Sequence, residues 1–346
     1  MTPSTGTRVT PEGAPAARLN ARLHTILSQG ADPTQLAALH RDAADLLGDS
    51  DEIMLLVECS LEYALSPERA VADSLAAWLD LRGRALTALP EHHPTMLAIR
   101  GYYIRWLRRR GEPGDLDLVV QLWQDEVDLR RSPLVGRHRL GVATADLAGA
   151  LLDRARWGHL DPHLKRHEPG TDLAEAHRLV TTEMGRRAGS YGVGHACVWQ
   201  ARLILADILC AQVQQGAPTP DPAHVEAAFT EADAILRHHW QRHRRHGRAA
   251  LRAQLVRAEM LTLLGRNRAA EREARLAAVL ARGYRDLDLG GPLLALARAQ
   301  SHRDRAEALR TALEALRERR LRYPPTGHRV AEAEQLVQAL SSSPDR

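Results

Sequence analysis

The sequence has very few aromatic residues and almost no lysine. Aromatic side chains make up 4% of the 346 residues, with a single phenylalanine, so alanine, leucine and valine must build the core. Such a core suits closely packed helices better than β-sandwiches. Lys165 is the sole lysine, and the other basic residues are arginine, a bias typical of a GC-rich bacterial genome. The net charge of +4 is small for this length and does not by itself require a nucleic-acid partner.

Cysteine is scarce as well. The chain has three cysteines that lie far apart and form no C-x-x-C pair: Cys59, Cys197 and Cys210. An odd number without the spacing of a disulfide framework predicts reduced thiols and a cytoplasmic protein. Residues 1–18 lack the apolar stretch of a signal peptide. The apolar run at 203–205 is broken by Asp207, well short of the ~20 residues that a membrane span needs.

Apolar side chains recur at helical spacing along the chain, and no segment sustains the alternation of a β-strand. One helical face begins at Ile53 and includes Leu56, Val57, Leu61, Ala64 and Leu65. Three dipeptides have the pattern of an N-cap followed by a first-turn proline: Asp32-Pro33, Ser66-Pro67 and Asp221-Pro222. We therefore expect an all-α protein with essentially no sheet.

A histidine returns at the junctions between these helices. The steps between successive histidines are 45, 57, 51 and 82 residues, the last being two steps of about 41, for His93, His138, His195, His246 and His328. Periods of roughly 34–47 residues indicate a stacked helical repeat, or solenoid. Because the placement repeats, we interpret these histidines as turn or helix-start residues rather than as pH sensors.

The breaks in the helical pattern predict the organisation of the chain. We expect a disordered tail at 1–16, N-terminal helices that cap the array at 17–74, and helical repeats at 75–340. A short C-terminal tail follows at 341–346. The longest interruption, at 158–171, accounts for the uneven 57-residue step and reads as an insertion on one face of the array.

The clearest single unit lies at 246–282 and carries a family resemblance. Its segment 264–271 (Leu-Gly-Arg-Asn-Arg-Ala-Ala-Glu) resembles the turn of a tetratricopeptide repeat (TPR), with a glycine placed to end the first helix. Ala277 matches the small residue of the family's second helix. The segments 91–97 and 191–195 are similar to the Gly-x-x-His-Pro turn of the long repeats of the kinesin-light-chain type.

The resemblance implies a right-handed superhelical solenoid of antiparallel helix pairs, with five or six degenerate units. The first helix of each pair would line the concave face. Such a surface implies binding of a protein or peptide, which could be acidic. In this family, asparagines on the inner helices commonly hold the backbone of a bound peptide. This chain has only Asn20 and Asn267, neither on an expected inner face, so the usual extended-peptide mode does not carry over.

Two basic clusters are the candidate binding sites. One is the turn at 237–248, where arginines and histidines surround a tryptophan that could stack on a ligand. Its histidines lack a nearby cysteine or carboxylate, and the arginines would repel a dication, so we predict no metal site. The other cluster combines aromatic and basic residues at 102–110. The candidate binding residues are Tyr103, Trp106, Trp199, Arg202, Arg237, Trp240, Arg242, Arg244, Arg245, Arg248 and Arg252.

The sequence shows no catalytic motif, and we predict no cofactor. The first functional hypothesis is a non-enzymatic adaptor or regulatory subunit of a bacterial cytoplasmic pathway that binds a protein or peptide through its repeats. A second is a ligand-sensing regulator whose shape changes when a peptide or small molecule binds. A third is a binder of nucleic acid or a phosphate ligand through the 237–248 arginines. The sequence is compatible with both a monomer and a homo-oligomer.

Overall fold

A computed structural model describes residues 13–66, 69–133, 135, 137–164, 168–215, 222–241, 247–283 and 288–342. Within these residues the secondary structure is α-helical, with one short 3-10 turn and no strand. The chain divides into two compact units, Met1–Trp106 and Leu107–Arg346, and each is described by itself. The predicted boundary between capping helices and repeats, at 74/75, stays a prediction.

The first unit holds a short helical array that packs round an aliphatic core. Its buried side chains come mainly from the first three helices and include Leu23, Leu36 and Val57. Trp78 is fully buried and stacks on Tyr102 with ring centroids 4.9 Å apart. The helices are α1 (Gly13–Ser28), α2 (Pro33–Ala44), α3 (Glu52–Leu65), α4 (Val71–Ala88) and α5 (Pro94–Arg110), whose last turn belongs to the second unit.

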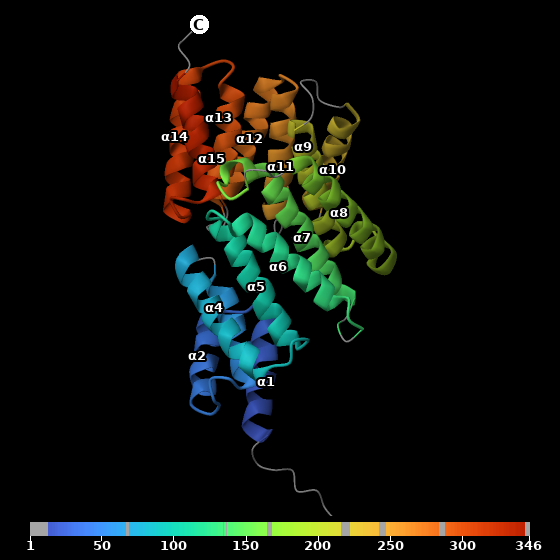
Figure 1. Cartoon of the computed structure of the whole chain (residues 1–346), viewed down its shortest axis with the longest axis vertical. Coiled ribbons are helices and arrows are strands. Elements are labelled where there is room, and N and C mark those ends of the chain that lie inside the picture. Colours follow the sequence, from blue (N-terminus) through green and yellow to red (C-terminus); the bar gives the residue numbers. More distant parts are fainter. Residues whose placement is uncertain are drawn as a thin grey trace, which may run out of the picture. The chain divides into compact units, whose positions relative to one another are not determined.

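The second unit is a succession of antiparallel helix pairs (Figure 1). Each helix packs against the next, and the odd-numbered helices from α7 to α15 also pack against one another, so they form the inner layer. The predicted all-α, TPR-like solenoid is therefore confirmed. The helices are α6 (Asp115–Arg130), α7 (Arg137–Trp157), α8 (Pro169–Tyr191), α9 (Ala196–Gln215), α10 (Pro222–Gln241), α11 (Gly247–Leu263), α12 (Asn267–Arg282), α13 (Gly290–Gln300), α14 (Arg305–Arg322) and α15 (His328–Ser342), with a 3-10 turn, η1 (Gly158–Leu160), after α7.

Alanine sets the close spacing of these pairs. The face of α12 that meets α11 and α13 buries Ala270, Ala274 and Ala277, each with no exposed surface. Side chains this small let helix backbones approach closely without voids. The low number of aromatic residues in the sequence is thus matched in the structure by helix contacts made through alanine.

Local capping signals begin and end the helices largely as predicted. Asp32 accepts a hydrogen bond from the backbone N–H of Thr34 and caps α2. Gly265 has φ of 69°, and the Arg266 N–H reaches the Leu261 carbonyl at 2.8 Å, which is the bond pattern of a Schellman motif. These confirmed signals depend on neighbours within five residues, so they can be read locally.

Two of the recurring histidines act as helix caps. The Nδ1 atom of His93 accepts the Thr95 N–H at 3.3 Å at the start of α5. His195 repeats this at the start of α9, where its Nδ1 accepts the Cys197 N–H at 3.2 Å. The predicted helix-start role is confirmed at these two positions. His246 and the side chain of His138 lie outside the described residues.

One predicted cap is wrong. Ser66 is the C-cap of α3, with helical φ and ψ of −53° and −32°, and α4 begins only at Val71. An N-cap needs an extended backbone, which Ser66 does not have. At the N-terminus, α1 begins at Gly13, inside the predicted tail, since Pro15 is tolerated in a first helical turn. Residues 1–12 and 343–346 of the predicted tails lie outside the described residues.

Helix α9 is the most apolar element of the second unit. By length and composition it could cross a membrane, and 61% of its apolar window is buried inside the protein. It packs against α7, α8, α10 and α11. A helix that contacts neighbours on all sides is apolar all round, so its composition follows from its central position.

The second unit closes on itself where α15 meets the end of α7, and Figure 1 shows the green segment after α7 beside the red α15. The indole Nε1 of Trp157 donates to Glu332 Oε2 at 3.2 Å. The ring of His328 stacks on Trp157 with centroids 4.3 Å apart, and its backbone N–H donates to Gly111 O at 2.9 Å. We call these three contacts the closing contact. They join residues more than 170 positions apart in the sequence.

His328 is held as a neutral ring within the closing contact. Its side chain is buried, and neither ring nitrogen has a hydrogen-bond partner within the described part of the chain. Burial and the adjacent Arg329 guanidinium lower the pKa of His328 to about 3, although Asp153 and Glu332 act in the opposite direction. The ring therefore works as a packing surface for Trp157.

Gly111 leaves room for that ring. It has φ of 61°, and a Cβ at this position would overlap the His328 imidazole. We predict that Gly111→Ala lowers the free energy of unfolding by about 2 kcal/mol or more, since it adds left-handed strain to a steric clash. Urea unfolding followed by circular dichroism measures this. Gly185→Ala in α8, where a Cβ meets open space, is the control and should be neutral or stabilising by up to ~1 kcal/mol. A Gly111→Ala protein as stable as the wild type would contradict the packing.

The buried neutral histidine also predicts a pH dependence. Because the folded-state pKa is about 3 against 6.5 in the unfolded chain, only the unfolded chain binds this proton as the pH falls below 6.5. Stability is therefore lost with falling pH, by ~2 kcal/mol between pH 7 and pH 5. His328→Gln removes this contribution, so the stability gap between wild type and variant should narrow by that amount. Parallel curves for the two proteins would show that the pKa of His328 is the same in the folded and unfolded chains.

Candidate functional site

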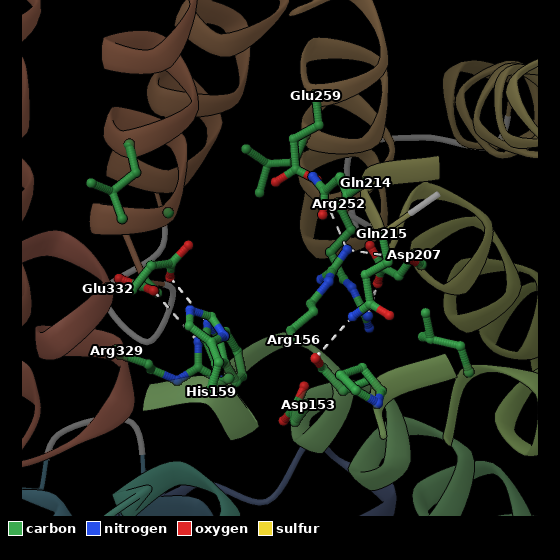
Figure 2. A pocket seen from close by; sticks show the side chains of 18 of the residues that line it. Asp153, Arg156, His159, Asp207, Gln214, Gln215, Arg252, Glu259, Arg329 and Glu332 are labelled. Atoms are coloured by element: carbon green, nitrogen blue, oxygen red, sulfur yellow. Dashed lines mark hydrogen bonds and ion pairs between the residues drawn. The ribbon is translucent and has the colours of Figure 1, made fainter. Parts of the chain in front are cut away.

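A cavity of about 1150 Å³ lies inside the second unit, against the inner layer of helices. Side chains from α7, α9, α11, α13 and α15 line it, together with Arg108 from the end of α5. Figure 2 shows polar side chains from opposite walls pointing towards its interior. Its lining is charged and mixed in sign, with six arginines against five carboxylates: Arg108, Arg156, Arg252, Arg298, Arg319 and Arg329, and Asp153, Asp207, Glu259, Asp288 and Glu332.

Glu332 organises the wall formed by α13, α14 and α15. Its carboxylate accepts from Arg298 at 2.7 Å and from Arg319 at 2.8 Å, in addition to the Trp157 indole. Burial favours the neutral acid, but these two guanidinium groups outweigh it and hold the pKa of Glu332 well below its usual range. A partly buried carboxylate with three donors is well compensated, so Glu332 is a structural anion.

Arg329 lies between two aromatic rings on the same wall. Its guanidinium carbon is 4.8 Å from the centroid of Trp157 and 5.2 Å from that of Tyr323. Asp288 lies 3.6 Å away and pairs with Arg319 as well. Cation–π contacts and an ion pair keep this arginine in place, so the wall next to the closing contact is rigid.

The opposite wall is built by α7, α9 and α11. Arg156 donates to the Asp207 carbonyl at 3.1 Å, and its guanidinium lies 3.8 Å from Glu259. Glu259 also accepts from the Cys210 thiol at 2.9 Å and from Gln214 at 3.2 Å. Burial and the Glu259 charge raise the pKa of Cys210 well above its ordinary value. Cys210 is therefore a thiol and not a nucleophilic thiolate.

Arg252, on α11, is the arginine that opens most to the cavity. Its side chain is 42% exposed, while the carboxylate of Asp207, its ion-pair partner, is 9% exposed. Burial within the protein, reinforced by the nearby charges of Arg108 and Arg156, lowers the pKa of Arg252 to about 10. This guanidinium thus has both a carboxylate partner and other arginines near it.

Four glutamines add neutral hydrogen-bonding groups to the lining: Gln212, Gln214, Gln215 and Gln335. Gln214 and Gln215 lie beside Arg252 in Figure 2. Each amide offers a donor and an acceptor, which match the C=O and N–H groups of a peptide backbone. In the family that the sequence resembles, asparagines commonly have this role, and glutamine has the same amide on a longer side chain.

Most of these lining residues were not singled out from the sequence. The available signal was a charged residue inside an otherwise apolar inner helix, as with Asp207 among the buried side chains of α9. Such a residue is costly to bury unless it is paired. The pairs, however, join helices that are distant in the chain, so the sequence pattern marks the residues without showing that they share one cavity.

The structure places the sequence-predicted binding residues in several locations. Arg252 lies in the cavity. Trp199 stacks on His238 at 3.9 Å, and Arg202 covers it at 4.9 Å while pairing with Glu231 at 3.2 Å. Arg237 is exposed on α10.

In the first unit, Trp106 is buried, and Tyr103 lies under the guanidinium of Arg82 at 5.2 Å, so both are packing residues there. The side chains of Trp240 and Arg248, and the residues Arg242, Arg244 and Arg245, lie outside the described part of the chain. The basic turn at 237–248 therefore stays a prediction. Among the residues that the structure describes, no group of three His, Cys, Asp or Glu is placed to hold a metal ion.

The sequence matches no protein-family model and no curated protein. Solved structures are similar to it. A Rap protein complexed with competence and sporulation factor covers 95% of this chain and 88% of its own, with 13% identity and a TM-score of 0.63. Two structures of nearly identical TPR-like repeats of a putative kinesin light chain from Podosopora anserina cover 68% of this chain and 97% and 100% of their own, at 16% and 14% identity, with TM-scores of 0.43 and 0.44. The chain is an all-α protein with a TPR-like helical repeat fold.

Proposed function

We propose that the cavity of the second unit binds a short peptide, and that the protein works as a peptide-responsive regulator or adaptor. The observation that carries this proposal is the lining itself: paired charges of both signs and four glutamine amides in one cavity of about 1150 Å³. That volume exceeds the roughly 300–1,000 Å³ of pockets that hold drug-sized molecules. A lining of mixed sign suits a zwitterionic chain better than a polyanion such as nucleic acid.

The ligand-sensing hypothesis has its own support. Trp157, Arg329 and Glu332 line the cavity, and Trp157 and Glu332 also form the closing contact. A ligand that touches these side chains has different contacts when the closing contact is formed and when it is broken. Such a difference is the condition for a ligand to shift a conformational equilibrium. We infer that peptide binding stabilises the closed form. The Rap protein of similar fold, solved with a factor bound, is consistent with this use of the fold.

A binding role, rather than catalysis, fits the state of the cavity's reactive groups. Its carboxylates are engaged in ion pairs, and the nearby Cys210 is a buried thiol. A catalytic nucleophile needs a depressed pKa or an adjacent free base. We therefore propose no reaction for this site.

Filling the cavity tests the proposal. A Cβ at Gly291, on the cavity wall, meets only Asp288 Oδ2 at 3.7 Å, and Gly185, on α8, faces open space. We predict that Gly291→Phe reduces retention of a synthetic random hexapeptide pool by at least ~10-fold, since the new ring occupies the ligand's volume. Gly185→Phe is the matched control and should retain the pool like the wild type. The readout is affinity selection with mass spectrometry on the full chain.

Two outcomes would overturn the peptide proposal. The first is a wild-type protein that retains no member of the hexapeptide pool. The second is a Gly291→Phe protein that retains the same peptides at the same level, because binding would then lie outside the cavity.

A further inference from the structure

The charges of the cavity are unevenly compensated. Arg108 donates to Asp153 at 2.5 Å and to the Gly149 carbonyl at 2.8 Å. Arg298 and Arg319 share Glu332. Arg108 and Arg319 thus use several N–H groups on the protein itself, so a ligand would have to displace an existing partner to bind them. Arg298 uses one terminal nitrogen, and its side chain is 35% exposed.

Arg252 is more exposed than these arginines. Within the described residues it donates to the carboxylate of Asp207 through one terminal nitrogen. A guanidinium has five N–H donors in a planar fork, and this side chain is 42% exposed and lines the cavity. Arg252 therefore keeps donors for a bound molecule while its position on α11 is set by the ion pair.

The surroundings of Arg252 favour an anion. Burial, together with the charges of Arg108, Arg156 and Arg329, acts against its protonated form and lowers its pKa to about 10. Asp153 acts in the opposite direction but is already held by Arg108, and Asp207 is the ion-pair partner of Arg252 itself. A further negative charge placed beside Arg252 would relieve the repulsion among the three arginines.

We propose that Arg252, flanked by Arg156, forms a carboxylate subsite that binds an acidic group of the peptide ligand. This rests on the proposed function and specifies its ligand. A planar carboxylate matches the guanidinium fork with two parallel hydrogen bonds. Gln214 and Gln215, next to Arg252 in Figure 2, are placed to bind the adjoining peptide group. The carboxylate comes from the chain terminus or from an aspartate or glutamate side chain.

Four hexapeptide pools separate these sources. They have free or amidated C-termini, each with or without Asp and Glu, and are offered to the wild-type full chain in affinity selection with mass spectrometry. Peptides that carry the carboxylate that Arg252 recognises should be retained ~10-fold or more above the amidated, acid-free pool, because a desolvated charge pair contributes about that much affinity. If retention depends on a free C-terminus, the ligand group is the terminal carboxylate. If it depends on Asp and Glu, the ligand group is a side-chain carboxylate.

Variants then locate the effect. Arg252→Gln should reduce the carboxylate preference to about twofold or less, and Arg252→Lys should keep part of it, because a lysine retains charge without the fork. Arg272→Gln, on the exposed face of α12, is the matched control and should keep the full preference. Circular dichroism checks that each variant is folded, and the wild-type comparison of the pools needs no variant at all.

The two proposals fail in distinguishable ways. Equal retention of all four pools, blocked by Gly291→Phe, would overturn the carboxylate subsite and leave peptide binding in the cavity intact. An unchanged carboxylate preference in Arg252→Gln would also overturn the subsite. No retention of any pool would overturn the proposed function as well.

Discussion

The partly buried carboxylate of Glu332 joins the two ends of the second unit. It accepts from Arg319 on α14, from Arg298 on α13 and from Trp157 at the end of α7. Removing its charge would leave two arginines facing each other across a poorly hydrated space, a cost that buried ion pairs normally offset. Repeat proteins contact mainly their sequential neighbours. Here a single acidic side chain adds a contact between the last helix and the first complete inner helix, and this contact bounds the cavity.

Closure and binding share residues, and this gives the fold a physical route to regulation. Trp157 contributes its indole N–H to closure and its ring to the cavity wall, with Arg329 above it. Under the proposed function, a peptide in the cavity would contact both ends of the second unit at once. Arg252, with a side chain that is 42% exposed, lies on the opposite wall, on α11, so the proposed ligand would be anchored there and sensed at the closing contact. Binding energy at one wall is in this way linked to the geometry of the other.

Sequence reasoning was accurate where the deciding interactions are local. The helices, the Asp32 cap, the Gly265 helix end and the histidine caps at His93 and His195 each depend on a few adjacent residues. The Ser66 cap was wrong because a residue that can cap a helix N-terminus can equally continue the preceding helix. The closing contact could not be predicted from the sequence, since Trp157 and Glu332 are 175 residues apart. For the same reason the sequence could mark Arg252 as a binding residue but could not show its cavity or its ion-pair partner Asp207. Arg252 and Asp207 meet only because α9 packs against α11.

A double-mutant cycle tests the central claim, that the second unit closes through Trp157 and Glu332. Trp157→Phe removes the indole donor, Glu332→Gln removes the charge, and the double variant removes both; urea unfolding gives the free energy of each protein. Because a hydrogen bond to a buried charged group contributes about 1.5–3 kcal/mol, the two substitutions should be non-additive by about 1 kcal/mol or more. Strict additivity would mean that α15 and the end of α7 do not meet in solution. The cavity would then be an open groove, and the account of closure would be contradicted.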